Sequence, residues 1–303
     1  MSEPVRFSII VPTYGRPEKM LQCLRAFAAL DYPCDRFEVL VVDDGSPQFV
    51  ATYVKPADYP FAVRVLRQHR QGPGIARNFG AAAALGSLLA FTDDDCTVAP
   101  GWLHAFDAAN AIEPAGLLGG SVKNACINDL FAETNQFIYE IVDDWFALEV
   151  TALRFFTSNS LCCSADRFQN IGGFSRLMVL AAGEDREFSM RWVRLGGTLR
   201  KVPDAILFHH HSQNVAKFTE MHFRYGRGAS ILHRILRTNV ARYTKPGLYW
   251  RLLAAPFFRR VNGPAWLVCL LIVWSQAMIG AGYLFQQWRF TQSRSNDLSS
   301  SRT

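Results

Sequence analysis

The sequence lacks the cysteine spacing of a zinc site or of a disulfide framework. Its seven cysteines include no CxxC pair, and their number is odd. Small secreted domains that depend on disulfides carry even, closely spaced sets of cysteines, so this class is excluded. The composition is also unlike that of disordered or fibrous proteins, because hydrophobic residues reach 50% and aromatic residues 13%.

The first residues do not have the pattern expected of a secretory leader. The first apolar run, residues 7–11, stops at Pro12 and is shorter than the apolar segment of a signal peptide. We therefore expect the N-terminal part of the chain to stay in the reducing cytoplasm.

Acidic residues are scarce in the last third of the chain. Residues 201–303 hold 14 Lys and Arg against 3 Asp and Glu, a balance of +11, whereas residues 1–200 hold 18 against 23, a balance of −5. This asymmetry predicts an anionic partner, such as phospholipid headgroups, for the last third alone. We expect no nucleic acid, because the cationic region adjoins an apolar stretch and the larger part of the chain is acidic.

Charge is absent altogether between Arg260 and Arg289. Within this stretch residues 265–285 are apolar except for two side chains, and as a helix they would span roughly 31 Å, enough for a bilayer core. The pattern favours one transmembrane helix over a buried core helix. Five cations before the span and three after it indicate a single-pass protein of the inner (plasma) membrane, with the preceding domain on the cytoplasmic face.

These patterns divide the chain into four segments. They are an α/β domain (1–212), a basic, partly amphipathic membrane-proximal helical segment (213–262), the transmembrane helix (263–288) and a short disordered tail (289–303). In the second segment, a helix would gather five cations within an arc of about 160°. They are Lys217, Arg224, Arg227, Arg234 and Arg237. We expect this arc to face an anionic leaflet, and an ordinary solvated face is the alternative.

The first domain alternates short apolar runs with amphipathic stretches, which is typical of βαβ units. Strands are expected at residues 7–11, 37–42, 62–66, 87–92, 117–122, 157–165 and 205–208, and helices at 17–30, 73–84, 129–148 and 183–195, with another beginning near Pro100. The pattern predicts a mostly parallel sheet with flanking helices. Polar clusters follow the strands, where open parallel sheets place their ligand crevice.

Three adjacent carboxylates, Asp93-Asp94-Asp95, follow the strand at 87–92. Like charges this close repel each other unless a cation or hydrogen-bond donors compensate them. Mg²⁺ or Mn²⁺ holding a diphosphate would supply that compensation. The alternative is a solvated turn or a helix cap.

Two further polar clusters end neighbouring strands. Asp43-Asp44-Gly45-Ser46 offers a carboxylate to a base or a ribose, although it is also a good turn sequence. In Pro12-Thr13-Tyr14-Gly15-Arg16, Tyr14 can lie against a base.

A glycine-rich segment, Gly72-Pro73-Gly74-Ile75-Ala76-Arg77-Asn78-Phe79-Gly80, opens a helix whose amides favour anions. Arg77 lies one turn into that helix, within reach of a nucleotide. The segment matches neither the P-loop nor the dinucleotide fingerprint.

Taken together and in order, the motifs resemble those of the family 2 inverting glycosyltransferases, which have the GT-A fold. The matching pieces are FSIIVPTYGRP, FEVLVVDDGS, GPGIARNFGAAAA, LLAFTDDDC, TSNSLCCSADRFQNIGGF and GEDREFSMRWVRLGG. The resemblance covers about residues 6–200. It implies a nucleotide-sugar donor, a divalent metal (Mn²⁺ or Mg²⁺) and transfer with inversion.

Site roles follow from this resemblance, position by position. The nucleotide-binding residues would be Pro12, Thr13, Tyr14, Arg16, Asp44, Arg77 and Asp93. Metal ligands would be Asp95, Asp94 and His211. The family usually has two aspartates around one variable residue, and here the middle position is also Asp. Which carboxylate binds the metal therefore stays open.

Glu184-Asp185 matches the acidic pair of the family at the start of a helix. Inversion needs a base opposite the leaving diphosphate, and we assign that role to Asp185, with Glu184 orienting it or binding the acceptor. Without the resemblance, an acidic pair at a helix start is explained by the helix dipole alone.

Three histidines, His209-His210-His211, end a predicted strand. Because side chains alternate along a strand, His209 and His211 share a face and one of them can complete a metal shell. A satisfied or solvent-facing imidazole is the alternative.

The sequence therefore predicts a membrane-anchored glycosyltransferase, a hexosyltransferase or a related enzyme, that acts on a lipid-linked or surface-polysaccharide acceptor. One alternative is a sugar-nucleotide nucleotidyltransferase, which would need a basic glycine-rich loop after the first strand. Another is a catalytically silent membrane-bound binding module.

Overall fold

The structure is a computed structural model that describes residues 3–148, 154–178, 180, 182–236 and 246–300. The chain divides into two compact units. We call residues 1–125, 151–179 and 185–211 the sheet unit, and residues 126–150, 180–184 and 212–303 the helical unit. The predicted domain 1–212 is thus interrupted, because residues 126–150 and 180–184 group with the C-terminal helices.

The sheet unit contains one sheet in the order β3-β2-β1-β4-β7-β6-β8-β5. Its strands are β1 (Phe7–Thr13), β2 (Phe37–Asp43), β3 (Ala62–Arg67), β4 (Leu88–Phe91), β5 (Cys96–Val98), β6 (Gly116–Asn124), β7 (Leu161–Ser164) and β8 (Thr198–His209). Strands β3, β2, β1 and β4 pair in parallel, and β6 pairs in parallel with β8. The pairs β4–β7, β6–β7 and β5–β8 are antiparallel, so the sheet is mixed.

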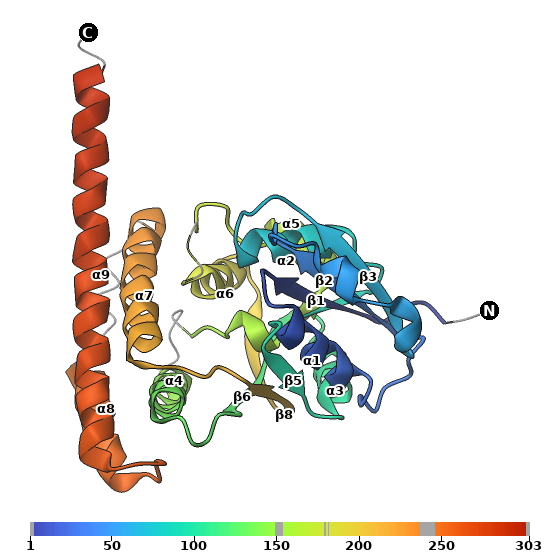
Figure 1. The fold of residues 1–303 in the computed structure, drawn as a ribbon, viewed down its shortest axis with the longest axis horizontal. Coiled ribbons are helices and arrows are strands. Elements are labelled where there is room, and N and C mark those ends of the chain that lie inside the picture. The colour runs from blue at the N-terminus through green and yellow to red at the C-terminus, as the bar shows by residue number, and fades with distance from the viewer. Residues whose placement is uncertain (1–2, 149–153, 179, 181, 237–245, 301–303) are drawn as a thin grey trace. The chain divides into compact units, whose positions relative to one another are not determined.

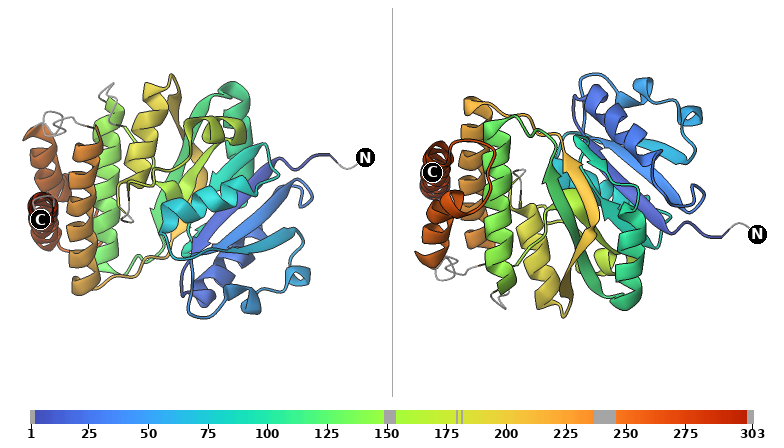
Figure 2. Two further views of the ribbon diagram at one scale, coloured as in Figure 1. Left: turned by 90° about the horizontal axis from the view of Figure 1, so that it is seen from above. Right: turned by 90° about the horizontal axis from the view of Figure 1, so that it is seen from below.

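Helices cover both faces of this sheet (Figures 1 and 2). The helices are α1 (Pro17–Phe27), α2 (Pro73–Ala82), α3 (Trp102–Ile112), α5 (Ala165–Ile171) and α6 (Glu184–Arg194). Strands β1 and β2 are buried along their whole length, because helices cover them on both sides. Most predicted elements occur within a few residues of their expected bounds.

Three strands depart from the prediction, and one of them is β8, which begins at Thr198 instead of residue 205. Strand β5 was not predicted, since three residues give no readable alternation. The strand expected at 157–165 begins only at Leu161, because Ser158–Ser160 form a 3₁₀ turn.

An aromatic core fixes the central elements. Four phenylalanine rings contact one another with centroids 4.7–5.7 Å apart in each contacting pair, and Trp192 adjoins the last of them. They are Phe91 of β4, Phe168 of α5, Phe174 in the segment before α6, and Phe188 of α6. The core thereby holds the strand that precedes the three aspartates against the helix that carries Asp185.

The helical unit consists of α4 (Leu130–Leu148), α7 (Val215–Leu236), α8 (Pro246–Phe258) and α9 (Ala265–Ser300). One apolar cluster joins α4, α8 and α9, with Ile141, Val268 and Ile272 at its centre. Helices α7 and α9 also pack side by side (Figure 1). The apolar cluster explains why α4 groups with the C-terminal helices.

Helix α9 contains the predicted membrane span. Residues 265–292 are long enough and apolar enough to cross a membrane, by length and composition. Helix α9 continues to Ser300, through most of the segment 289–303 that the sequence predicts as a disordered tail. No proline or glycine after Gly282 interrupts the helix.

The cationic arc expected on residues 217–237 is only partly on the surface. On α7, Lys217 and Arg234 are exposed, but Arg234 stacks 4.3 Å from the Phe290 ring centroid of α9. Arg227 donates to Gln286 Oε1 at 3.0 Å. Arg237 lies outside the described residues.

Candidate active site

The acidic turn after β4 gives its three aspartates different surroundings. Asp94 is buried, and its Oδ2 accepts a 2.7 Å hydrogen bond from Thr13 Oγ1 while Oδ1 lies 2.5 Å from Arg16 Nη2. Burial raises the pKa of Asp94 to about 7, although Arg16 and Thr13 oppose it. Asp94 therefore ties the end of β1 to the acidic turn.

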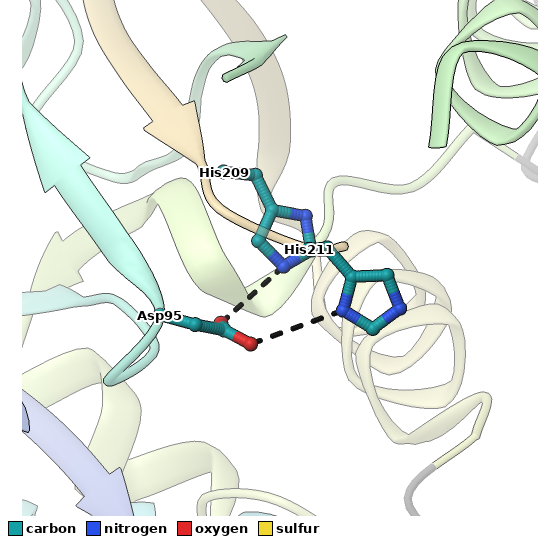
Figure 3. Close-up of side chains that lie close together, drawn as sticks. All are labelled: Asp95, His209 and His211. Carbon is teal, nitrogen blue, oxygen red and sulfur yellow. Dashed lines mark ion pairs between the residues drawn. The ribbon is translucent and has the colours of Figure 1, made fainter. Parts of the chain in front are cut away.

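Asp95 faces a pair of imidazoles (Figure 3). His209 Nε2 lies 3.3 Å from Asp95 Oδ1, and His211 Nδ1 lies 3.8 Å from Oδ2. One ligand atom from each residue falls within 4.8 Å of the others. Burial alone would raise the pKa of Asp95, but the two imidazoles and Arg16 outweigh it and hold that pKa well below its usual range.

Strand pairing builds this cluster. Cys96, the first residue of β5, pairs with His209 at the end of β8, and His210 N donates to Asp95 O at 2.8 Å. His210 Nε2 contacts Thr97 Oγ1 at 2.8 Å instead. The predicted alternation is confirmed, because His209 and His211 share a face.

The donor set fits a divalent metal ion. One ionised carboxylate beside two imidazoles suits a transition metal better than Mg²⁺, which prefers oxygen ligands. Two cations also approach Asp95 Oδ2, namely Arg16 Nη1 at 3.0 Å and Lys19 Nζ at 3.4 Å. Both cationic side chains are partly exposed. Asp95 thus has two cations and two imidazoles around one carboxylate.

Asp94, predicted as a metal ligand, lies outside the group that could hold an ion. Its oxygens face Thr13 and Arg16 instead. Among the three adjacent carboxylates the geometry favours Asp95, and it adds His209, which the prediction named only as an alternative to His211.

The second acidic cluster anchors the glycine-rich segment. Both oxygens of Asp44 accept backbone hydrogen bonds at 2.8 Å, from the amides of Gln71 and Gly72, and Gln68 Nε2 adds a third at 2.7 Å. Gly72 has a φ of 92°, which explains the glycine there. Asp44 thus fixes the start of α2.

Tyr14 presents a flat surface beside this segment. Its side chain is 36% exposed, and the Arg70 guanidinium stacks 4.0 Å from the ring centroid. The prediction missed Arg70, because its only signal is a cation shortly before the glycine-rich segment. Pro12 lies within buried β1, paired with Val42.

Arg77 lies between two of the carboxylates. It is 2% exposed, and its Nη2 lies 2.5 Å from Asp93 Oδ1. It also interacts electrostatically with Asp185. Its neighbour Asn78 both donates to and accepts from the backbone of Phe174 at 2.8 Å. The glycine-rich segment thereby links the acidic turn to the region before α6.

Asp185 lies in the first turn of α6, as predicted. Its Oδ1 accepts from Arg186 N at 2.7 Å. Burial raises the pKa of Asp185, and the Arg186 amide and the charge of Arg77 oppose this only in part. Glu184, the first residue of α6, is buried.

Comparison with known proteins places these motifs in a family. The model of glycosyl transferase family 2 matches residues 8–159. The chain is 32% identical over 118 residues to the glycosyltransferase AglE of Haloferax volcanii, covering 38% of this chain and 39% of that protein. It is 27% identical over 202 residues to the pre-mycofactocin glycosyltransferase of Mycobacterium tuberculosis, covering 64% and 42%. It therefore matches about two fifths of the length of these relatives.

Solved structures share the fold. The mannosyltransferase PcManGT of Pyrobaculum calidifontis, in complex with GDP-Man and Mn²⁺, superposes with a TM-score of 0.68 at 18% identity, covering 95% of this chain and 90% of that one. TarS of Staphylococcus aureus (residues 1–349), in complex with UDP-GlcNAc, gives 0.55 at 20% identity, covering 95% and 92%. The sheet, its motifs and these likenesses agree, and the chain belongs to glycosyl transferase family 2, with the GT-A fold.

Proposed function

We propose that this glycosyltransferase passes a sugar, with inversion, from a nucleotide-sugar donor to a lipid-linked or surface-polysaccharide acceptor. The observation that carries the proposal is the group of Asp95, His209 and His211 at the carboxyl edge of the sheet, where open parallel sheets place their ligand crevice. Structural neighbours were solved with GDP-Man and with UDP-GlcNAc, which supports a nucleotide sugar as the donor class.

Binding of the nucleotide is assigned to the motifs of the first half. The exposed face of Tyr14, stiffened by Arg70, would stack on the base. Asp44 shapes the adjoining segment by holding the amides of Gln71 and Gly72. Asp93 has one oxygen on Arg77 and is 30% exposed, so it can accept from a ribose hydroxyl. Pro12 and Thr13 act through the backbone turn that carries Tyr14.

A divalent ion, Mn²⁺ or Mg²⁺, would be held by Asp95, His209 and His211. When bound, such an ion neutralises the charge that develops on the departing nucleoside diphosphate. Arg16 and Lys19 border the same carboxylate and would contact diphosphate oxygens. Asp94 positions Thr13 and Arg16 instead of binding the ion.

Asp185 is proposed as the base that takes the proton from the acceptor hydroxyl. A carboxyl whose pKa is raised by burial is a stronger base than an exposed one, and Arg77 and Arg186 keep its charged form accessible. Glu184 would orient the acceptor at the start of α6.

The membrane motivates the choice of acceptor. Helix α9 is a candidate membrane helix, and a lipid-linked substrate diffuses in the plane of the membrane. We propose that the sheet unit works at the cytoplasmic face of the inner membrane, next to an anionic leaflet, because the last third of the chain has a charge balance of +11.

The two alternatives have less support. A nucleotidyltransferase would need a basic glycine-rich loop directly after β1, and the segment Pro12-Thr13-Tyr14-Gly15-Arg16 offers only one glycine and one cation there. The family match favours glycosyl transfer. A silent binding module would have no need of an aspartate and two histidines arranged to hold a metal, and turnover of a donor with metal would exclude it.

The test compares Asp185→Asn with the matched variant Asp166→Asn, which changes an exposed aspartate of α5. We expect Asp185→Asn to lower the transfer rate by about 10²- to 10⁴-fold, because a general base contributes about that much, while calorimetric binding of the nucleotide stays unchanged. Asp166→Asn should behave as the wild type. NMR of the product should show the anomeric configuration opposite to that of the donor. Near-normal turnover of Asp185→Asn would remove the base assignment, and retained configuration would remove inversion.

A further inference from the structure

Helix α9 exposes an apolar face, unlike a surface helix of a soluble protein, which turns its apolar face to the core. Its exposed face is apolar from Trp266 to Trp288. The residues of that face are Trp266, Leu270, Val273, Trp274, Ala277, Gly280, Ala281, Leu284, Phe285 and Trp288. The buried side is mixed, since it contains Ser275 and Gln286 besides Val268 and Ile272. Exposed contiguous apolar surface of this kind marks contact with another apolar phase.

Helix α8 extends this surface. Trp250, Phe257 and Phe258 are 73%, 63% and 86% exposed, and the last two lie seven and eight residues after Trp250, which places all three on one side of the helix. An apolar groove of about 150 Å³ joins the two helices, and its lining includes Tyr249 of α8 and Val273 of α9, both themselves exposed. The groove therefore joins exposed apolar surface of both helices. We call them together the apolar face.

The partner that fits the apolar face is a phospholipid bilayer. Four of the seven tryptophans of the chain lie on it, and tryptophan prefers the boundary between headgroups and acyl chains. The surrounding third of the chain carries 14 cations against 3 acidic residues, which complements anionic headgroups.

The way in which α9 meets the bilayer follows from its neighbour α7. Trp274 Nε1 donates to Thr219 Oγ1 at 3.0 Å, and Gln287 Nε2 donates to Ser230 Oγ at 3.1 Å. The second contact lies C-terminal to the first on both α7 and α9. The two helices therefore run parallel over most of the apolar stretch. Between these points the backbones touch, because a Cβ at Gly226 would lie 1.9 Å from Ile279 O.

This pairing sets the depth of charged side chains. Ile279 lies at the middle of residues 265–292, so a crossing α9 would place Gly226 near the centre of the bilayer. Arg224 and Arg227 are within one turn of Gly226, and Glu220 within two. A charged side chain at that depth costs several kcal/mol of free energy, whereas the same side chain in the headgroup region costs little. Helix α4, which packs on the first half of α9, carries Glu133 and Glu140.

We infer that the helical unit lies along one leaflet, with the apolar face immersed at the boundary between headgroups and acyl chains, and that α9 does not cross the bilayer. This replaces the single crossing expected from the sequence. It is independent of the proposed reaction, because it rests on the helices of the helical unit alone. The arrangement places the C-terminus on the same side of the membrane as the sheet unit.

The first test measures topology. The full chain receives protease-cleavable tags before Met1 and after Thr303, and it is assembled into sealed, inside-out membrane vesicles. Added protease should remove both tags at similar rates while a lumenal marker stays protected. A C-terminal tag that is protected until detergent is added would overturn the inference.

The second test measures depth in vesicles that contain anionic phospholipid. One variant retains only Trp274 of the four exposed tryptophans and its matched control retains only Trp288, with phenylalanine at the other three positions. Lipids brominated near the headgroup should quench both about equally, and lipids brominated near the chain ends should quench neither strongly. Stronger deep quenching of Trp274 than of Trp288 would indicate crossing. Failure of the protein to sediment with the vesicles would remove the membrane contact itself.

Discussion

The two units of this chain differ in where their large apolar side chains lie. In the sheet unit, apolar side chains such as Phe91 and Phe174 are fully buried, and the carboxylates of the acidic turn gather at the edge of the sheet beside cations. In the helical unit, Trp250 and Phe258 are exposed, while Ser275 and Gln286 are buried between helices. The first pattern is typical of water as the solvent, and the second of a surface that meets lipid.

The largest expected effect tests the charge cluster of the sheet unit. Asp95→Ala removes the carboxylate that faces His209 and His211 and leaves Arg16 and Lys19 without it. We expect transfer activity to fall by about 10⁴-fold, since an ion in this role is worth several kcal/mol. Calorimetric titration with Mn²⁺ should lose its binding signal as well.

The matched control is Asp58→Ala, which changes an exposed carboxylate of the same unit. If Asp95→Ala kept Mn²⁺ binding at wild-type affinity, the metal would lie elsewhere.

The next effect concerns the packing of the helical unit. Gly226→Ala should destabilise the α7–α9 pair by about 3 kcal/mol, because the new methyl group would meet the backbone of Ile279, which cannot move aside cheaply. Gly280→Ala is the control, since a Cβ there meets nothing within 4 Å, and the change should be neutral or slightly stabilising. Thermal unfolding in detergent measures both. Equal stability of the two variants would argue against the close approach of α7 and α9.

A third change compares exposed apolar side chains of the two units. Phe258→Glu should weaken binding to anionic vesicles about tenfold, because burial of a phenylalanine is worth about 1.5–3 kcal/mol. Leu85→Glu alters a 68% exposed residue of the sheet unit and should leave vesicle binding unchanged. Sedimentation with vesicles reports the affinities. If both variants lost binding alike, the apolar face would have no special role.

The smallest effect depends on pH and concerns the start of α4. Asp129 accepts from the amides of Phe131, Ala132 and Gln213, and these hydrogen bonds outweigh burial and lower its pKa. Because the folded pKa lies below the unfolded value of 3.8, the stabilisation is present above that value and is lost as the pH falls through the folded pKa.

Asp129→Ala should therefore cost about 1 kcal/mol at pH 7, and the difference from the wild type should shrink below about pH 4. Urea unfolding at both pH values measures it. A difference that is constant with pH would show that the charge of Asp129 contributes nothing.

Much of the fold could be predicted from the sequence, because strands such as β1 and β2 carry continuous apolar runs and end in polar clusters. The alternation of the three histidines was predictable because successive side chains of a strand point to opposite faces. What the sequence could not give depends on pairing between distant residues. Strand β5 exists because Cys96 meets His209, and the separate surroundings of Asp94 and Asp95 arise only once β1, β5 and β8 come together.

The helical unit was predicted least well. The composition of residues 265–285 indicates an apolar helix, but only the structure pairs it with the charged α7. Similarly, the grouping of α4 with α8 and α9 depends on contacts between residues more than 100 positions apart in the chain, such as Arg259 with Asp144 at 2.8 Å.

The central claim is that the edge of the sheet holds a metal-dependent site for a nucleotide sugar. The most direct measurement follows release of nucleoside diphosphate from UDP-, GDP- and dTDP-sugars by the detergent-solubilised protein, with Mn²⁺, Mg²⁺ or EDTA. The account predicts release from one donor class, with Mn²⁺ more effective than Mg²⁺, and its loss in EDTA. Undiminished release in EDTA, or no release and no calorimetric binding of any bare nucleotide, would contradict it.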